Sequence, residues 1–353
     1  MKGNSNRVAF ICTIINTMTN NIKAYQNNPQ LKTPKAPEGW QGTPVDQKGM
    51  FLNLNHPFVP SLADVFRWKL ESSPFKKEKK AEVWNPLVFK DNSWVKGNND
   101  IIIWLGHSTF YIRVAGIQIL TDPVFGDILS VKRRSEFPLD PHLLINLNYI
   151  LLSHDHRDHL DDKSLKLLSK QNLNVKYLTG LGMKEIVHNF TGSNKIEEAG
   201  WYQQYSTGND SLKITFIPSR HWSTRGLFDT NQRLWGGFVI ETANKRILFG
   251  GDSGYDTHYK QLAAVFGSFD YAILGIGAYE PAWFMSANHQ SPADALKGFT
   301  ELNSARFIPM HYGTFDLSDE PLSQPLKDLQ VAAKRLNLEG KLEVLNIGKP
   351  FVL

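Results

Sequence analysis

A short apolar run followed at once by a cluster of histidines and aspartates decides the fold of this chain. It reads Tyr149-Ile150-Leu151-Leu152-Ser153-His154-Asp155-His156-Arg157-Asp158-His159. The apolar part predicts a buried strand, and the part after it has the form His-x-His-x-Asp-His. Packing alone gives a fold no reason to place so many metal-binding side chains together. The stretch therefore predicts a metal site at the end of a strand.

The spacing of these residues suggests two metal ions. Residues two apart share a face in an extended chain, so His154 and His156 can hold one metal. Asp158 and His159 lie just beyond, on the next turn, and can hold a second metal nearby. Neutral imidazole nitrogen and carboxylate oxygen suit Zn²⁺, and also Fe or Mn.

The remaining ligands are expected at the ends of other strands. His221, Asp252 and His311 each follow an apolar, strand-like segment. A layered α/β fold builds its site at the edge where its strands end, so these side chains are candidates to complete the two metal sites. A carboxylate at Asp252 can bridge two metals through its two oxygens.

Strand-like and helical segments occur in two groups beyond residue 100. Each group of short, β-branched segments is followed by helical stretches, which predicts an α/β protein with two sheets face to face and helices outside. The expected strands are 101–105, 109–114, 117–121, 149–152, 212–217, 237–242, 246–249, 271–275 and 306–309, and the expected helices are 60–71, 163–169, 258–266, 292–302 and 326–336.

The first 45 residues have a different character. Residues 16–45 are rich in Asn, Gln, Thr, Lys and Pro with little periodicity, which predicts a flexible arm. The apolar run 8–15, preceded by Lys2 and Arg7, resembles a weak signal segment. We therefore expect an N-terminal arm or signal over residues 1–45 and one domain over 46–353. Export through this signal is the alternative to a peripheral membrane location on the cytoplasmic side.

Composition narrows the chemistry. The single cysteine, Cys12, excludes an intrachain disulfide and a cysteine-based zinc site. The net charge of +5 fits a protein that meets phosphates or an anionic membrane surface. There is no repeat of aromatic and basic residues for stacking bases, so no nucleic-acid partner is expected.

The ordered set of candidate ligands resembles that of the metallo-β-lactamase superfamily, in which His-x-His-x-Asp-His is followed by His, Asp and His. The resemblance covers roughly residues 95 to 350 and implies a metallo-β-lactamase αβ/βα four-layer sandwich. It also implies two zinc ions. The implied ligands are His154, His156 and His221 for the first zinc, Asp158, His159 and His311 for the second, and Asp252 as the bridge.

Further stretches are similar to the N-acyl-phosphatidylethanolamine-hydrolysing phospholipase D family. Two departures from its pattern are Ala282 and Tyr312, where the family has Arg and Trp, and the missing cation at position 282 bears on contacts to phospholipid. The similar stretches are 104–109, 120–125, 234–236, 250–255, 277–281, 283–285 with His289 and Pro292, 311–315 and, more weakly, 51–53 with Trp68.

This resemblance implies a phosphodiesterase that converts N-acyl-phosphatidylethanolamine into an N-acylethanolamine and phosphatidic acid. Two metals can bind a hydroxide between them at neutral pH, and this hydroxide would attack phosphorus. Asp158 and Asp252 would orient it. His289, on the loop before the helix at Pro292, is the candidate to contact the substrate or assist the leaving group.

Three more residues have expected roles around this site. Tyr279 and Trp283 are candidates to line an acyl-chain pocket. His107, in a Gly-His-Ser turn, is a candidate to hydrogen-bond to a metal ligand from outside, because such ligands need oriented neighbours.

The expected partner is a phospholipid at a membrane surface. The region of Phe66, Trp68 and lysines 76–80 could dock there through aromatic and basic side chains, and an apolar groove shared across a homodimer would suit a lipid. Two alternatives remain. A hydrolase of a soluble phosphodiester or a lactone would keep the metal site, and a non-catalytic binding protein would keep only the fold.

Overall fold

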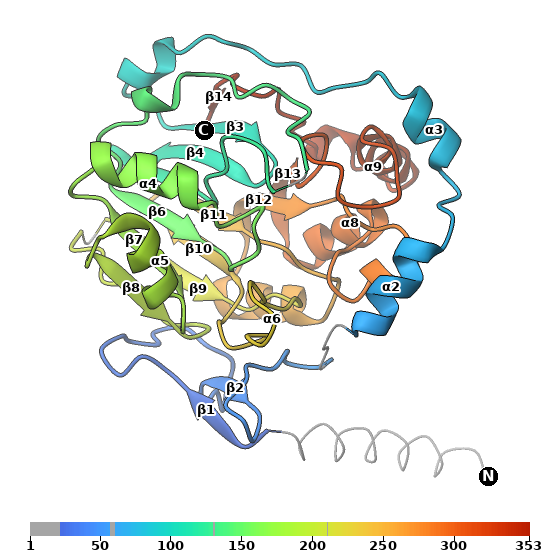
Figure 1. Ribbon diagram of the computed structural model, residues 1–353. Coiled ribbons are helices and arrows are strands. Elements are labelled where there is room, and N and C mark those ends of the chain that lie inside the picture. The colour runs from blue at the N-terminus through green and yellow to red at the C-terminus, as the bar shows by residue number, and fades with distance from the viewer. Residues whose placement is uncertain (1–21, 57–60, 130, 210) are drawn as a thin grey trace.

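Two β-sheets that face each other form the centre of the computed structural model, which describes residues 22–56, 61–129, 131–209 and 211–353 (Figure 1). The larger sheet contains β3 (Ile101–Gly106), β4 (Thr109–Val114), β5 (Ile117–Thr121), β6 (Tyr149–Leu152), β7 (Lys176–Gly180), β8 (Ile196–Ala199) and β14 (Phe351–Val352). The smaller sheet contains β9 (Lys213–Ile217), β10 (Gly237–Glu241), β11 (Arg246–Phe249), β12 (Phe269–Gly275) and β13 (Ser304–Met310).

Each sheet mixes antiparallel and parallel strands. The order is β14-β3-β4-β5-β6-β7-β8 in the larger sheet and β13-β12-β11-β10-β9 in the smaller one. The strands β5 to β8 run parallel to one another, as do β11 to β13. Parallel strands end at the same edge of a sheet, so the loops that follow β6, β11 and β13 can bring their residues together.

The strands of the larger sheet are buried on both faces. Ile102 and Trp104 pack in the core between the sheets, whereas their neighbours Ile101 and Ile103 pack in a second core on the opposite face. This alternation follows from the two-residue period of a strand, and it explains why these strands appear in the sequence as continuous apolar runs.

Helices cover the outer face of each sheet. The second core lies beneath α4 (Asp162–Gln171) and α5 (Lys184–Thr191), and the smaller sheet is covered by α6 (His258–Phe266), α8 (Pro292–Glu301) and α9 (Gln324–Arg335). Side-chain caps fix where two of them begin, since Asp161 accepts from Ser164 N and Ser291 from Asp294 N. The predicted four-layer α/β sandwich is confirmed.

Short helices lie outside these layers. The predicted helix near residue 61 is present as α2 (Leu62–Leu70), and Ser61 caps it by accepting from Ala63 N. The others are α3 (Lys76–Ala81), α7 (Ala282–Met285) and the 3-10 turns Ser93–Lys96, Pro141–Leu143 and Glu339–Lys341. Within the described ranges, none of the helices has the length and apolar character needed to cross a membrane.

Residues 22–45 do not form the flexible arm that their composition predicts. They contain β1 (Ala24–Gln26) and β2 (Thr43–Val45), which pair with each other and lie against the lower edge of the molecule in Figure 1. Asn28 donates from its side chain to Glu198 O, and Lys35 pairs with Glu241 at 2.7 Å. The polar residues that suggested disorder are therefore used in hydrogen bonds to the body. The weak signal segment falls in residues 1–21, outside the described residues, and the boundary at residue 46 stays a prediction.

Candidate metal centre

The structure brings all the predicted metal ligands together at one edge of the two sheets. Every one of them lies just past the end of a strand and is carried by the segment that leaves it. The groups are His154, His156, Asp158 and His159 after β6, His221 after β9, Asp252 after β11, and His311 after β13.

Three imidazoles form the first cluster. Nε2 of His154 lies 2.9 Å from Nδ1 of His156, and Nε2 of His221 lies 3.1 Å from the same atom. His154 and His221 are fully buried. Three nitrogens that face one another at this distance form a set of donors to which one cation can bind.

A second cluster lies beside the first. Oδ2 of Asp158 is 3.5 Å from Nε2 of both His159 and His311. Oδ2 of Asp252 is 3.1 Å from each of the same two nitrogens. These groups combine imidazole nitrogen with carboxylate oxygen, a donor set that suits zinc.

Asp252 belongs to both clusters. Its Oδ2 is also 3.9 Å from Nε2 of His154 and from Nε2 of His221. The side chain is almost fully buried, and its other oxygen, Oδ1, has no hydrogen-bond partner among the described residues. A buried carboxylate with an unpartnered oxygen is costly unless something positive binds it. The residues present therefore fit a pair of cations with Asp252 between them.

Electrostatics in this cluster depend on the two carboxylates. Burial lowers the pKa of His154 and His221 well below the usual value, so both rings are neutral and able to bind a metal. Burial also opposes protonation of His311, but Asp252 and Asp158 outweigh it and raise its pKa to about 9. Burial opposes ionisation of Asp252, and the charges of His159 and His311 still hold its pKa well below the usual range. Metal binding must therefore displace protons from this cluster.

Hydrogen bonds from outside orient the ligand rings. Nδ1 of His159 donates to Oδ2 of Asp122 at 2.8 Å, and Ser153 donates to the same oxygen at 2.6 Å. Oγ of Ser153 in turn lies 2.9 Å from Nδ1 of His154. Asp122 thus fixes one ligand directly and a second through Ser153, which leaves Nε2 of each ring free to face a metal.

His107 lies beside two of the predicted ligands, Asp158 and His311. Its Nε2 is 3.1 Å from Oδ2 of Asp158, and its backbone N–H donates to Thr314 Oγ1. The ring also lies 4.1 Å from that of His311, centre to centre. His107 thus lies in the same group of potential metal-binding side chains as Asp158, His159 and His311, and it can hold Asp158 in place.

A cleft of about 380 Å³ opens onto both clusters. Its floor is formed by the ligands, and its walls combine cations with apolar side chains. The wall residues are Arg157, Trp222, Thr224, Arg225, Ala278, Phe284, Met285, Asn288, His289 and Leu317. A substrate with an anionic group next to an apolar part matches this lining.

His289 is part of the cleft, whereas Tyr279 and Trp283 are not. Nδ1 of His289 lies 3.8 Å from Oδ2 of Asp252. The hydroxyl of Tyr279 is turned away and donates to Asp328 Oδ2 at 2.6 Å. Trp283 is 42% exposed on the outside of α7, and its neighbour Phe284 faces the cleft instead. Adjacent residues of a helix lie on different faces. Trp283 was predicted to line the pocket, and Phe284 is the residue that does so.

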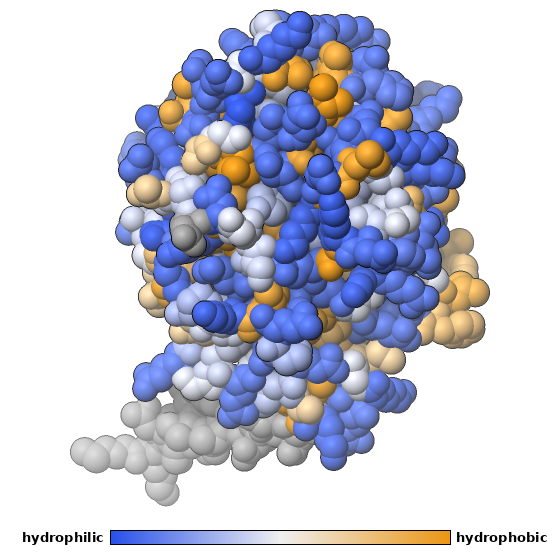
Figure 2. All heavy atoms as spheres, turned by 90° about the vertical axis from the view of Figure 1, so that its left-hand side faces the viewer, coloured by the Kyte–Doolittle hydropathy of each residue, from blue (hydrophilic) through white to orange (hydrophobic). Residues whose placement is uncertain are grey.

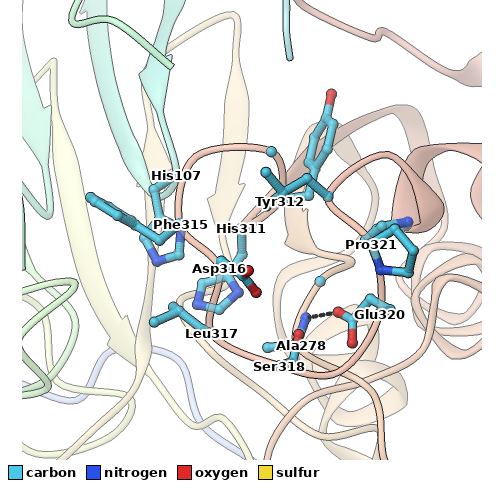
Figure 3. A pocket seen from close by; sticks show the side chains of 14 residues that line it. His107, Ala278, His311, Tyr312, Phe315, Asp316, Leu317, Ser318, Glu320 and Pro321 are labelled. Atoms are coloured by element: carbon cyan, nitrogen blue, oxygen red, sulfur yellow. Dashed lines mark hydrogen bonds between the residues drawn. The ribbon is translucent and has the colours of Figure 1, made fainter. Parts of the chain in front are cut away.

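The wall next to His311 is held by a buried carboxylate. Figure 3 shows Glu320 reaching the backbone of Ala278 in the small cavity behind His311. Glu320 accepts from Ala278 N at 2.7 Å and from Glu280 N at 3.1 Å. The loop between β12 and α7 is therefore fixed, and with it one side of the cleft.

Four residues at the site have no role predicted from the sequence: Asp122, Glu320 and the cleft cations Arg157 and Arg225. Asp122 had a signal, because it directly follows strand β5 just as the predicted ligands follow their strands. Glu320 had none, since it contacts a loop some forty positions earlier.

Comparison with known proteins agrees with this geometry. Residues 118–312 match the family model described as Beta-lactamase superfamily domain. The chain is 34% identical over 227 residues to N-acyl-phosphatidylethanolamine-hydrolyzing phospholipase D 1 of Caenorhabditis elegans. This alignment covers 61% of this chain and 64% of that protein. It is 30% identical over 318 residues to the mitochondrial N-acyl-phosphatidylethanolamine-hydrolyzing phospholipase D of Saccharomyces cerevisiae. This alignment covers 86% of this chain and 67% of that protein.

The first of these relatives is longer than the matched part, since the chain spans only 64% of its length. Among solved structures, a Veillonella parvula protein described as a possible metal-dependent hydrolase has a TM-score of 0.59 at 15% identity, covering 72% of this chain and 100% of that chain. This likeness shows the fold alone. The fold, the family match and the ordered set of ligands lead to one conclusion: the chain belongs to the metallo-β-lactamase superfamily and resembles its N-acyl-phosphatidylethanolamine-hydrolysing phospholipases D.

Proposed function

We propose that this protein is a dinuclear zinc phosphodiesterase of the phospholipase D type, which hydrolyses N-acyl-phosphatidylethanolamine to an N-acylethanolamine and phosphatidic acid. The observation that carries the proposal is the place of Asp252 between two groups of metal-binding side chains, at the floor of a cleft with cationic and apolar walls. The names of the two relatives support this choice of substrate.

The reaction divides into binding, attack and departure. Two divalent cations held by the clusters would lower the pKa of a water molecule and offset the charge on the phosphoryl oxygens. Asp158 and Asp252 accept hydrogen bonds from the attacking water and orient it. The water oxygen forms a bond to phosphorus, the bond from phosphorus to the ethanolamine oxygen breaks, and the departing oxygen takes up a proton that comes from the water.

Arg157 and Arg225 can hold the acidic end of the substrate at the cleft wall. Phe284, Met285 and Leu317 can cover the first carbons of the acyl chains, because burial of apolar surface is favourable. This combination favours a phospholipid over a small soluble diester, which would leave the apolar wall in contact with water.

His289 is proposed to hydrogen-bond to the substrate rather than to supply a proton. Burial lowers its pKa to about 4, so the ring is neutral at pH 7. We expect His289→Ala to lower kcat/KM by about 100-fold, within the range for loss of one transition-state hydrogen bond, without changing the zinc content. Steady-state kinetics and metal analysis of the same preparation check this. His188→Ala is the control, since His188 lies on α5, contacts Ser193 O through Nδ1 and is not among the residues that line the cleft. Unchanged kcat/KM in His289→Ala would remove the residue from the mechanism.

A side-by-side assay tests the proposed function. Protein of known metal content is incubated with N-acyl-phosphatidylethanolamine, plain phosphatidylethanolamine, bis-p-nitrophenyl phosphate and a simple lactone. We expect the N-acylated lipid to give the highest kcat/KM and the two stated products. Turnover of the soluble diester or the lactone alone would support the alternative hydrolase. Absence of turnover in protein that binds no metal would support a binding protein.

A phospholipid substrate would enter the cleft from a membrane surface. The loops around the cleft carry side chains that suit contact with such a surface. Leu227 and Phe228 are about 90% exposed at the tip of a loop whose earlier residues line the cleft. Asp229 closes that loop by accepting from Gly226 N at 2.8 Å, and Arg233 pairs with Asp229 at 2.7 Å. These contacts hold the loop in a form that exposes its apolar tip, which is unfavourable in water and favourable in the interface of a bilayer.

Another part of the cleft wall is formed by α7, and α2 packs against α7. Phe66 and Leu70 are exposed on α2, next to the exposed cations Arg67 and Lys69, which can contact anionic headgroups. Trp68 does not belong to this surface. Its ring stacks on that of Phe284 in the cleft wall, with 5.2 Å between the ring centres, and its Nε1 donates to Asp319 Oδ1. The face that carries α4 and α5, by contrast, is largely hydrophilic (Figure 2).

We expect the double variant Leu227→Ser with Phe228→Ser to bind anionic phospholipid vesicles about 100-fold more weakly. Each buried side chain of this size contributes roughly 1.5–3 kcal/mol. Vesicle co-sedimentation measures the binding. Turnover of soluble bis-p-nitrophenyl phosphate should not change, because neither residue lines the cleft. Leu173→Ser, which changes a similarly exposed leucine just after α4, is the matched control. Equal binding by the double variant and this control would contradict the proposed surface.

A further inference from the structure

A segment early in the chain, residues 51–55, runs beneath two of the loops that carry the candidate ligands. Phe51 N–H donates to Asn231 O, and Leu52 N–H donates to Pro44 O, so the segment is anchored both to the body and to β2. Two asparagines of this segment, Asn53 and Asn55, each contact a different loop.

Asn53 holds the backbone of His221. Its Nδ2 donates to His221 O at 2.8 Å, and its Oδ1 accepts from His221 N at 3.0 Å. The side chain is buried. His221 lies between β9 and β10, outside any strand, and buried backbone groups there need partners that no neighbouring strand supplies. A carboxamide provides one donor and one acceptor, and therefore satisfies both groups.

Asn55 holds the loop that follows Asp252. Its Nδ2 lies 2.7 Å from Thr257 Oγ1 and 3.2 Å from Asp256 Oδ1. The two loops are also joined to each other, since Gly254 N–H donates to Arg220 O at 2.8 Å. The segment 51–55 thus connects the loops that carry His221 and Asp252.

We propose that Asn53 is a positioning residue for the first metal: it fixes the backbone of His221 so that Nε2 meets the nitrogens of His154 and His156. The ring itself is oriented by a separate bond, from Nδ1 to Asn288 O at 3.0 Å. Backbone position and ring rotation are therefore set by different residues, and both are required for Nε2 to lie 3.1 Å from Nδ1 of His156. The inference rests on the proposed metal centre.

This assignment gives the N-terminal segment a part in the site. The residues that match the family model begin at 118, so Asn53 lies well outside them. The bond between Asn53 and His221 spans 168 positions. The two residues are far apart in the sequence. They meet because residues 43–55 pack against the body of the protein.

Zinc titration of the intact chain tests the proposal. We expect Asn53→Ala to lower the affinity for one of the two zinc ions by 10- to 100-fold, as loss of an outer hydrogen bond to a metal ligand typically does. The affinity for the other zinc ion should not change. Asn28→Ala is the matched control. It removes an asparagine of the same N-terminal region that donates to a backbone oxygen of the body, Glu198 O, but contacts no ligand loop. Melting of the metal-free proteins measures what each variant loses in stability alone.

Cobalt substitution supplies a second readout. The visible spectrum of bound Co²⁺ reports coordination geometry, and we expect it to change in Asn53→Ala and not in Asn28→Ala. If Asn53→Ala does not melt cooperatively, Asn53→Asp takes its place, because it keeps the volume and the acceptor while losing the donor to His221 O. Two zinc equivalents of unchanged affinity, with an unchanged spectrum, would overturn the proposal. A wild-type chain that binds no zinc would instead refute the metal centre itself.

Discussion

We expect Asp252→Asn to lower kcat/KM by about 1,000-fold or more, as removal of a central electrostatic contact in a buried site does, and to leave at most one zinc per chain. The substitution keeps the size of the side chain but removes its negative charge. Oδ2 of Asp252 lies within 3.1 Å of both His159 and His311, so an amide in its place cannot balance the charge of two cations. Kinetics and metal analysis of one preparation measure both effects.

The control for this variant is Asp270→Asn. Asp270 lies on the strand next to β11 and accepts from Arg246 N at 2.7 Å, away from the cluster. It should keep both zinc ions and full activity. Wild-type activity in Asp252→Asn, or two tightly bound zinc ions in that variant, would be incompatible with a bridging role for this carboxylate.

Asp122→Ala has the second large expected effect, on stability as well as on metal binding. The carboxylate is fully buried and accepts from His159 Nδ1, from Ser153 Oγ and from Ser153 N. Its removal leaves buried donors without partners, at a cost of about 1–3 kcal/mol each. We expect the free energy of unfolding of the metal-free protein to fall by at least about 3 kcal/mol, and zinc affinity to fall 10- to 100-fold.

Chemical denaturation and zinc competition measure these two quantities. Asp127→Ala provides the comparison, because Asp127 also accepts a backbone hydrogen bond, from Arg133 N, but lies in an exposed loop. If Asp122→Ala unfolds at the same denaturant concentration as Asp127→Ala and binds zinc as the wild type does, Asp122 has no part in holding the site.

The fold was predictable where a local pattern determines it. The continuous apolar runs of β3, β6 and β11 follow from burial on both faces of a sheet. The start of α8 follows from Ser291 and Pro292, a cap and a first-turn proline. Residues 22–45 misled the prediction because their polar side chains bond to distant parts of the body, and composition does not reveal such partners.

The candidate site divides in the same way. The ligands were predictable because metal binding demands particular residue types and each follows a strand. Two of the supporting residues were not predictable. Asn53 and Glu320 have ordinary local surroundings, and their partners lie 168 and 42 positions away. The orientation of α7, which turns Phe284 rather than Trp283 into the cleft, depends on its contacts with α2.

The anomalous X-ray scattering of a crystal of the zinc-loaded protein tests the central claim most directly, because it locates each zinc ion independently of activity. We predict two zinc ions, one among His154, His156 and His221 and the other among Asp158, His159 and His311, with Asp252 contacting both. A single zinc ion, or ions bound elsewhere on the chain, would contradict the dinuclear centre on which the proposed phosphodiesterase depends.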